Sequence, residues 1–251
     1  MILDRYYYQQ LTEKEQQIYR EFYHGIMKQD DIIPISVHGK LEQESFERVF
    51  MAMTRDNPLI YFLNQSACST ATDIFGHTAI CPQYFFPKEK VREYNRKIEI
   101  AVNSIVEKLE LIKCGEYERE LRIHDWICKN VSYDFDGSDK ENVPRVIASH
   151  NILGVFAFHK AQCEGIAKAF KVLLNTVDIK CIVVTGEAGK NGKTSPHAWN
   201  IVNIDGKAYH VDVTWNIGAS RREKVAYNYF NVVDEIMKKD HKVADMLPKC
   251  R

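Results

Sequence analysis

The dipeptide Asp205-Gly206 is the feature that most constrains how this chain folds. It lies between two apolar runs, His197–Ile204 and Lys207–Trp215, and is the only segment separating them. An Asp-Gly pair in this setting favours a type I′ turn, in which both central residues adopt positive φ. The two runs are therefore predicted to form an antiparallel β-hairpin.

The turn also fixes which residues lie opposite each other, with Ile204 opposite Lys207. Counting back, Trp199 is predicted to oppose Asp212, and His197 to oppose Thr214. One face of the hairpin would then be core: Ala198, Val202, Ile204, Tyr209, Val211, Val213 and Trp215. The other face would carry His197, Trp199, Ile201, His210, Asp212 and Thr214. On that face His197 and Asp212 are diagonal neighbours, about 7 Å apart at the backbone and within reach of an imidazole–carboxylate hydrogen bond.

A helix is predicted upstream of the hairpin, with Cys163 as its first residue. Its apolar stripe follows helical spacing: Cys163, Ile166, Ala167, Phe170, Leu173, Leu174 and Val177. The first turn of a helix offers free N–H groups and the positive end of the dipole, which lower the pKa of a thiol. Gly165 is expected to leave room near the Cys163 backbone for a tetrahedral oxyanion. Cys163 is therefore the candidate nucleophile.

These residue types suit acyl transfer through a thioester. Cys163 would attack an amide carbonyl, His197 would protonate the leaving amine, and Asp212 would hold the imidazole tautomer. Two other interpretations are possible. In the first, each of the three residues serves only in packing or at the surface. In the second, a metal is bound by Cys163, His197, His210 and Asp212. Their spacing matches none of the familiar Cys/His zinc patterns, so we expect no metal and no cofactor.

The rest of the chain is predicted to be helix-rich in its first half. Helices are expected after the capping box of Thr12 and Glu15, at Gln43–Thr54, from Pro87 to Ile112 and at Glu116–Asn130, and strands at Ile32–Val37, Leu59–Leu63 and Cys181–Thr185. Glu187–Pro196 is rich in Gly, Lys and Asn and is expected to be a mobile loop, where Lys190 and Lys193 could contact an acidic partner.

We divide the chain into an N-terminal accessory region, 1–85, and a catalytic core, 86–251.

Composition excludes several classes of protein. The 251 residues carry 34 Lys+Arg and 34 Asp+Glu, and such a balance argues against nucleic acid as a partner. The longest apolar stretches, such as Ile152–Phe158, are far below the roughly 18 residues that span a bilayer, so no membrane role is expected.

Met1–Gln10 lacks a signal-peptide core, which predicts a cytoplasmic protein, or a secreted one if a leader has been removed. The seven cysteines are an odd number without C-x-x-C spacing, which disfavours a disulfide framework. Oligomeric state is left open.

Three segments resemble the motifs of the transglutaminase-like superfamily, in the same order along the chain. Gln162–Ala167 reads C-E-G-x-A after its first residue, Pro196–Asn200 contains H-A-W-N, and His210–Trp215 contains D-x-T-W. The bacterial transglutaminase-like cysteine protease branch is the most similar. Leu121–Asp134 resembles the helix and Tyr-Asp element that often precedes these motifs. The resemblance implies an α+β, papain-like fold with the nucleophile helix packed on an antiparallel sheet, and Cys163, His197 and Asp212 as catalytic triad.

The resemblance also implies a function. We expect a cysteine-dependent amide hydrolase or acyltransferase acting on peptide or protein amides; hydrolysis, deamidation and transamidation stay open. The Cys163 backbone N–H is the first oxyanion donor, and the second, in contact with substrate, is Gln162, Tyr133 or Trp199. The alternative is a catalytically silent protein-interaction module that keeps the fold.

Overall fold

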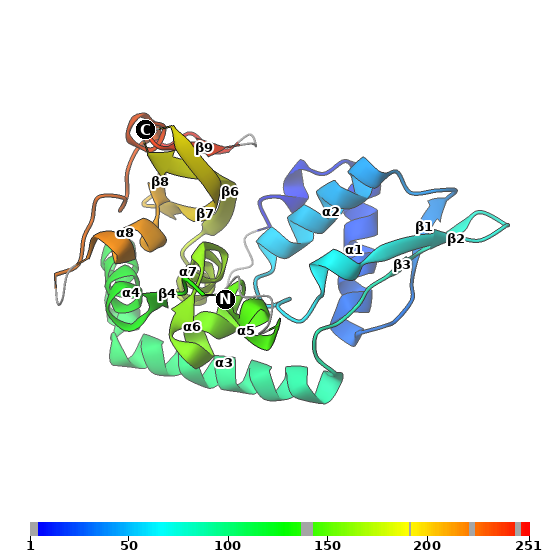
Figure 1. The fold of residues 1–251 in the computed structure, drawn as a ribbon, viewed down its shortest axis with the longest axis horizontal. Coiled ribbons are helices and arrows are strands. Elements are labelled where there is room, and N and C mark those ends of the chain that lie inside the picture. The colour runs from blue at the N-terminus through cyan, green and yellow to red at the C-terminus, as the bar shows by residue number, and fades with distance from the viewer. Residues whose placement is uncertain (1–4, 137–142, 191, 221–223, 244–246) are drawn as a thin grey trace. The chain divides into compact units, whose positions relative to one another are not determined.

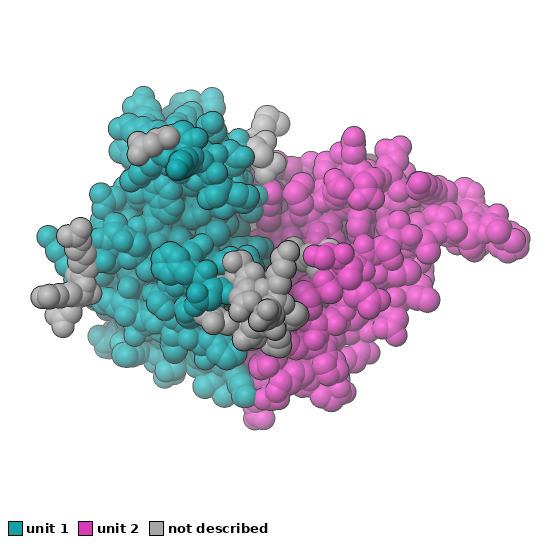
Figure 2. Space-filling model, viewed as in Figure 1, with its two compact units in different colours: residues 1–4, 97–251 teal, residues 5–96 magenta. Residues whose placement is uncertain are grey.

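The computed structural model describes residues 5–136, 143–190, 192–220, 224–243 and 247–251 (Figure 1). The chain divides into two compact units, residues 5–96 and residues 97–251 with the first four (Figure 2). The division falls inside helix α3 (Lys88–Lys108), whereas the sequence placed its boundary ahead of that helix, at residues 85 and 86. In the described ranges no helix combines the length and apolar character needed to cross a membrane.

The unit of residues 5–96 combines helices with an antiparallel sheet of strand order β1-β3-β2. Its elements are η1 (Tyr8–Gln10), α1 (Glu13–Lys28), β1 (Ile33–His38), α2 (Gln43–Asp56), η2 (Gln65–Ala67), β2 (Ser69–Thr72) and β3 (His77–Cys81). The predicted capping box is confirmed, because Thr12 and Glu15 exchange side-chain and backbone hydrogen bonds where α1 begins. α1 packs on β1 and α2 through an apolar face that includes Phe22 and Ile26.

Two expectations for the first part of the chain are wrong. Leu59–Leu63 is not a strand; it forms turns, and only Leu63 makes an isolated bridge, to Tyr84. The helix expected to reach Ile112 ends at Lys108, because Glu110 adopts a left-handed conformation with φ of 50° and starts a short 3₁₀ turn, η3 (Leu111–Lys113).

The second unit holds the predicted hairpin and nucleophile helix. Its elements are η3, α4 (Glu116–Asn130), β4 (Ser132–Tyr133), α5 (Val143–Ser149), α6 (Ile152–Phe158), β5 (Lys160–Ala161), α7 (Cys163–Thr176), β6 (Cys181–Lys190), β7 (Lys193–Ile204), β8 (Lys207–Val211), α8 (Val213–Ala219), α9 (Asp234–Met237) and β9 (His241–Val243). The strands β8-β7-β6-β9 form an antiparallel sheet, and α7 packs on β6 and β7 (Figure 1). The α+β fold with the Cys163 helix on an antiparallel sheet is therefore confirmed.

Helix and sheet are held together by buried polar contacts as well as apolar packing. Asn200 on β7 donates its amide to the Ala167 carbonyl of α7 over 3.0 Å. Lys171, on the same helix, donates to the Cys181 carbonyl of β6. Both side chains are almost fully buried, and buried polar groups of this kind are normally hydrogen-bonded, as these are. These contacts fix α7, and with it Cys163, against the two central strands.

The hairpin turn has the predicted conformation but its second strand is shorter than expected. Asp205 and Gly206 have φ of 50° and 78°, as a type I′ turn requires, and Ile204 pairs with Lys207. The ladder ends at Val211, opposite Asn200. The chain then turns into α8, so the predicted cross-strand pairs of Asp212 and Thr214 do not form. From Ala198 to Val202 both faces of β7 are buried, so Trp199 and Ile201 on the second face are core residues as well, whereas Lys193–Pro196 are exposed.

The stretch predicted as a mobile loop, Glu187–Pro196, is instead a long extension of strands β6 and β7, with Asn191 outside the described residues. Its glycines fit because neighbouring backbones come too close for a side chain. A Cβ on Gly189 would lie 1.8 Å from the Lys193 carbonyl oxygen, and one on Gly186 would lie 2.1 Å from that of Lys242. The glycine content therefore reflects close strand packing.

Candidate active site

Cys163 is the first residue of α7, as predicted. The first intrahelical hydrogen bond of α7 runs from the Ile166 N–H to the Gln162 carbonyl, so the N–H of Cys163 has no partner within the helix. The half-buried thiol packs against Ala167, Val183 and Ala198 at the junction of helix and sheet. The sulfur thus lies beside free backbone donors and the positive end of a helix dipole.

His197 connects the thiol to the carboxylate. Its Nε2 lies 2.7 Å from Oδ2 of Asp212, and its ring also interacts with the side chain of Cys163. Because Asp212 occupies Nε2, the contact with Cys163 involves Nδ1. The structure therefore brings together the three residues predicted as nucleophile, base and orienting carboxylate.

Asp212 reaches His197 by a different route from the predicted one. It is the N-cap of α8, and its Oδ1 accepts a hydrogen bond from the Trp215 backbone N–H over 2.9 Å. Its side chain is fully buried. The carboxylate therefore orients the imidazole with one oxygen and caps a helix with the other.

The charges of this pair are set by their contacts. Burial disfavours the ionised form of each group, but their mutual hydrogen bond and opposite charges outweigh it. The pKa of Asp212 is consequently lowered. Burial alone would lower the pKa of His197, yet the hydrogen bond to Asp212 and the neighbouring Cys163 side chain raise it to about 9. At neutral pH His197 is therefore an imidazolium beside an ionised carboxylate.

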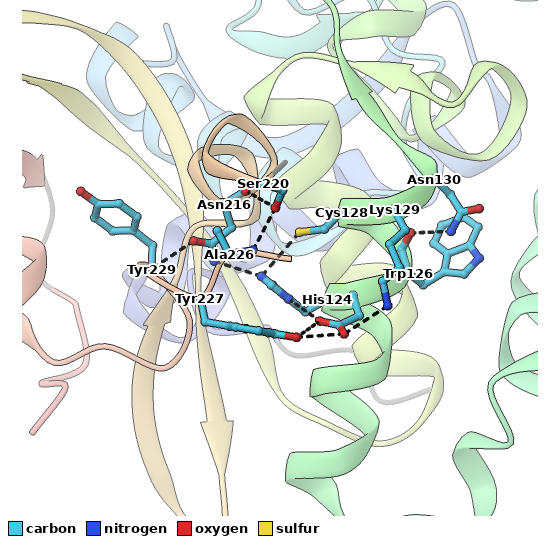
Figure 3. Close-up of polar contacts among 11 residues, drawn as sticks. His124, Trp126, Cys128, Lys129, Asn130, Asn216, Ser220, Ala226, Tyr227 and Tyr229 are labelled. Atoms are coloured by element: carbon cyan, nitrogen blue, oxygen red, sulfur yellow. Dashed lines mark hydrogen bonds and ion pairs between the residues drawn. The ribbon is translucent and has the colours of Figure 1, made fainter. Parts of the chain in front are cut away.

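Helix α8 is tied to α4 by the contacts in Figure 3. Asn216, one turn after Asp212, donates its amide to Nε2 of His124 over 2.9 Å, and its carbonyl oxygen accepts from the Tyr229 N–H. Because Nε2 of His124 accepts, the ring hydrogen is on Nδ1, which lies 3.2 Å from Asp125. This anchor holds the start of α8, and thus Asp212, in place.

Sequence reasoning missed His241, a second histidine on Asp212. Its Nε2 lies 3.0 Å from the same Oδ2 that His197 contacts. The residue is on the short strand β9 in the run Lys238–Lys242, which has the composition of a solvated surface segment. No periodicity or motif in that run indicated a buried position.

The three residues expected to contact substrate lie in different places. Tyr133 lines a cavity of about 550 Å³ beside His197, together with Phe135, Trp215, Tyr229 and Lys190 among others. Gln162 donates its side-chain amide to the Asp134 carbonyl over 3.3 Å. Trp199 is 1% exposed, stacks on the His197 ring with centroids 6.0 Å apart, and donates its indole N–H to His210.

Gly165 does not provide the oxyanion space that the sequence suggested. A Cβ at this position would lie 2.6 Å from the Ser149 carbonyl oxygen and 2.8 Å from that of Asn151. The missing side chain instead lets α7 pack closely on the segment that joins α5 to α6. Gly165 is therefore a packing residue.

The four side chains considered for a metal site are not brought together as a set. Within the described ranges, ligand atoms lie within 4.8 Å of one another in two groups, His197 with Asp212 and His241, and His210 with Asp234 and Cys250. In the second group Nδ1 of His210 accepts the Trp199 N–H, so the ring hydrogen is on Nε2, which faces Asp234. A metal-bound histidine usually donates from its other nitrogen, so hydrogen bonding explains this group better than a metal.

Residues 104–213 match the family model of the transglutaminase-like superfamily. This segment belongs to that superfamily. It contains all three predicted site residues, from Cys163 to Asp212. The superfamily resemblance read from the motifs is thus confirmed, while its bacterial branch stays a prediction.

Two curated proteins are similar to part of this chain. The kyphoscoliosis peptidase of Mus musculus is 26% identical over 129 residues, which are 48% of this chain and 19% of that protein. The kyphoscoliosis peptidase of Homo sapiens is 27% identical over 111 residues, or 41% of this chain and 16% of that protein. The aligned part thus spans less than a fifth of these relatives. A solved structure of a TGase is similar with a TM-score of 0.42 and 16% identity, covering 76% of this chain and 52% of that one.

Proposed function

We propose that this chain is a cysteine-dependent enzyme that cleaves or transfers the acyl group of a peptide or protein amide through a thioester on Cys163. The observation that carries the proposal is the His197–Asp212 hydrogen bond with the Cys163 side chain next to the same imidazole, within a transglutaminase-like segment. A thiol beside an imidazolium that is itself held by a carboxylate is the arrangement that activates a cysteine nucleophile.

The reaction has two steps. In the first, the Cys163 sulfur bonds to the amide carbon and the carbonyl electron pair moves to oxygen. His197 then gives its Nδ1 proton to the amide nitrogen, the C–N bond breaks, and the amine leaves. In the second, water or a primary amine attacks the thioester and passes a proton to His197, and the C–S bond breaks. Hydrolysis and acyl transfer differ only in that second nucleophile.

The oxyanion formed in each step needs hydrogen-bond donors. The Cys163 N–H is the first, since it has no partner within α7. We assign the second to Gln162 or Tyr133, because the indole N–H of Trp199 already donates to His210. The names of the two curated relatives favour peptide hydrolysis as the first activity to test.

Alkylation of the intact protein tests the proposal. Iodoacetamide at mildly acidic pH is expected to modify Cys163 well before the other six cysteines, because a thiolate reacts and a thiol does not. Peptide mapping by mass spectrometry shows the order in which the cysteines are modified.

The Cys163→Ala variant should fold normally and lose turnover, measured as peptide cleavage and ammonia release with and without added amine. Cys68→Ala, which removes another half-buried thiol, is the control. If Cys163 reacts last, or its Ala variant keeps full activity, the proposal fails and the silent interaction module takes its place.

The charge of His197 gives a second, pH-dependent prediction. Iodoacetate is attracted by an imidazolium and iodoacetamide is not, so the ratio of their alkylation rates at Cys163 reports the charge on His197. Because the pKa of His197 lies above its ordinary value, the imidazolium persists through neutral pH and is lost as pH rises through about 9. The ratio should therefore be constant near pH 7 and fall through pH 9. A midpoint near the ordinary histidine value of about 6.5 would contradict this.

A further inference from the structure

Asp212 has two imidazole partners on a single oxygen. Its Oδ2 lies 2.7 Å from Nε2 of His197 and 3.0 Å from Nε2 of His241, while its Oδ1 is occupied by the Trp215 N–H. The Asp212 carboxyl and the His241 ring are both fully buried. Any charge on one of these groups is therefore felt by the others with little screening by water.

His241 itself lies between two carboxylates. Its Nε2 faces Asp212 and its Nδ1 lies 2.7 Å from Oδ1 of Asp240. The other oxygen of Asp240 accepts a hydrogen bond from the Tyr229 hydroxyl. A neutral imidazole has one N–H and can donate on one side only, whereas an imidazolium donates on both. Both contacts are thus satisfied together only by a positively charged ring.

Aromatic side chains enclose the ring. The centroid of His241 lies 4.5 Å from that of Trp215, 5.0 Å from that of Trp199 and 5.4 Å from that of Tyr229. Aromatic faces attract a cation and exclude water from it. Burial in this enclosure opposes the charge, so the two flanking carboxylates are what favour the imidazolium.

We propose that His241 is a positioning residue: a buried imidazolium that holds Asp212 in place and limits how tightly His197 binds its proton. This proposal rests on the proposed function, because its consequence is felt at the Cys163 thiol. The two rings lie 5.6 Å apart, so a charge on His241 repels a charge on His197 directly and also competes for Asp212. His197 must give its proton to the leaving amine, and His241 makes it the stronger acid for that step.

The titratable groups facing His241 come from several elements. They are His197 on β7, His210 on β8, Asp212 at the start of α8, Asp240 beside it in the chain and Tyr229 from the segment between α8 and α9. On the neighbouring strand β6 it pairs with Ala188, next to Glu187, whose carboxylate accepts a hydrogen bond from Thr194. Lys190 lies with its ammonium 5.2 Å from the Trp215 ring.

The test is the pH dependence of the iodoacetate to iodoacetamide rate ratio at Cys163 in the full chain. His241→Gln removes the charge and keeps one amide donor. The midpoint of the ratio is expected to move to higher pH by about one unit. A merely structural role for His241 would change the rates without moving this midpoint. His77→Gln, which removes another histidine hydrogen-bonded to an aspartate, is the matched control and should leave the midpoint unchanged. An unshifted or lowered midpoint in the folded His241→Gln variant overturns the proposal.

A measurement on the unaltered protein keeps the proposal testable if that variant does not fold. With ¹⁵N-labelled histidine, both ring nitrogens of His241 should carry hydrogens at pH 7, assigned through the signals that shift in an Asp240→Asn sample. A single protonated nitrogen overturns the proposal. The proposed function fails separately, if Cys163 of the wild-type chain shows no enhanced reactivity with either reagent.

Discussion

Replacing Asp212 with Asn is expected to reduce turnover by roughly 10⁴-fold, the size of effect found when the orienting aspartate of a serine protease triad is made neutral. The fully buried carboxylate accepts hydrogen bonds from His197, His241 and the Trp215 N–H. An amide has a single accepting atom, so with its oxygen towards the two rings its NH₂ would face the Trp215 N–H. The change also removes the negative charge that raises the pKa of His197. The imidazolium is then no longer favoured at neutral pH, so the Cys163 sulfur loses the positive charge beside it.

Two measurements check this. Initial rates on a peptide amide substrate should fall as stated, and alkylation of Cys163 by iodoacetamide at mildly acidic pH should slow to the rate of an ordinary thiol. Circular dichroism establishes that the variant is folded. Asp73→Asn removes a carboxylate from another histidine–aspartate pair, in the other unit, and should change neither rate. Retention of most of the alkylation rate in a folded Asp212→Asn protein would show that the carboxylate does not control the thiol.

Replacing Glu120 with Gln is expected to stabilise the protein by about 3 kcal/mol at pH 7. Glu120 on α4 is fully buried and accepts one hydrogen bond, from the Asn231 amide over 2.7 Å. Its other oxygen, and the side-chain oxygen of Asn231, have no hydrogen-bond partner among the described residues. Burial raises the pKa of Glu120 to about 8, against which the bond from Asn231 acts. The folded protein therefore keeps this carboxyl protonated at neutral pH.

The sign of the pH dependence follows from linkage. The unfolded chain ionises Glu120 near pH 4.5 and the folded protein only near pH 8, so stability falls with rising pH between those values. Glutamine stays neutral and removes this loss, and its amide has hydrogens to offer the unpartnered oxygen of Asn231. Urea unfolding should show a small gain at pH 5 and a gain several times larger at pH 7.5. Glu118→Gln, a half-exposed change on the same helix, should stay within about 0.5 kcal/mol at both. An equal change at both pH values would mean that Glu120 is ionised in the folded protein.

Local signals predicted the parts of the fold that depend on few neighbours. The capping box at Thr12, the Asp205-Gly206 turn and the apolar stripe beginning at Cys163 each specify their structure within a short segment. Since two of these signals flank the candidate site, the nucleophile helix and the His197 strand were predicted correctly. The contact between His197 and Asp212 was also predicted.

The remaining errors arise where tertiary contacts override local preference. The β-branched and aromatic run after Asp212 predicts a strand, but Asp212 instead caps a helix that Asn216 anchors to α4. Gly186 and Gly189 suggest a loop until the closeness of neighbouring backbones is known. His241 is enclosed by rings that are distant in sequence, so no pattern around it could indicate its position.

The number of residues in strand β8 determines the side of the hairpin towards which the Asp212 carboxylate points. Between the turn at Asp205-Gly206 and the end of the ladder at Val211, each residue of β8 alternates its side with the next, and Asp212 follows directly. Deleting one residue from β8 would reverse that alternation and aim the helix-capping carboxylate away from the imidazole. Protein engineers who graft this hairpin onto another scaffold must therefore transfer its strand length together with its side chains.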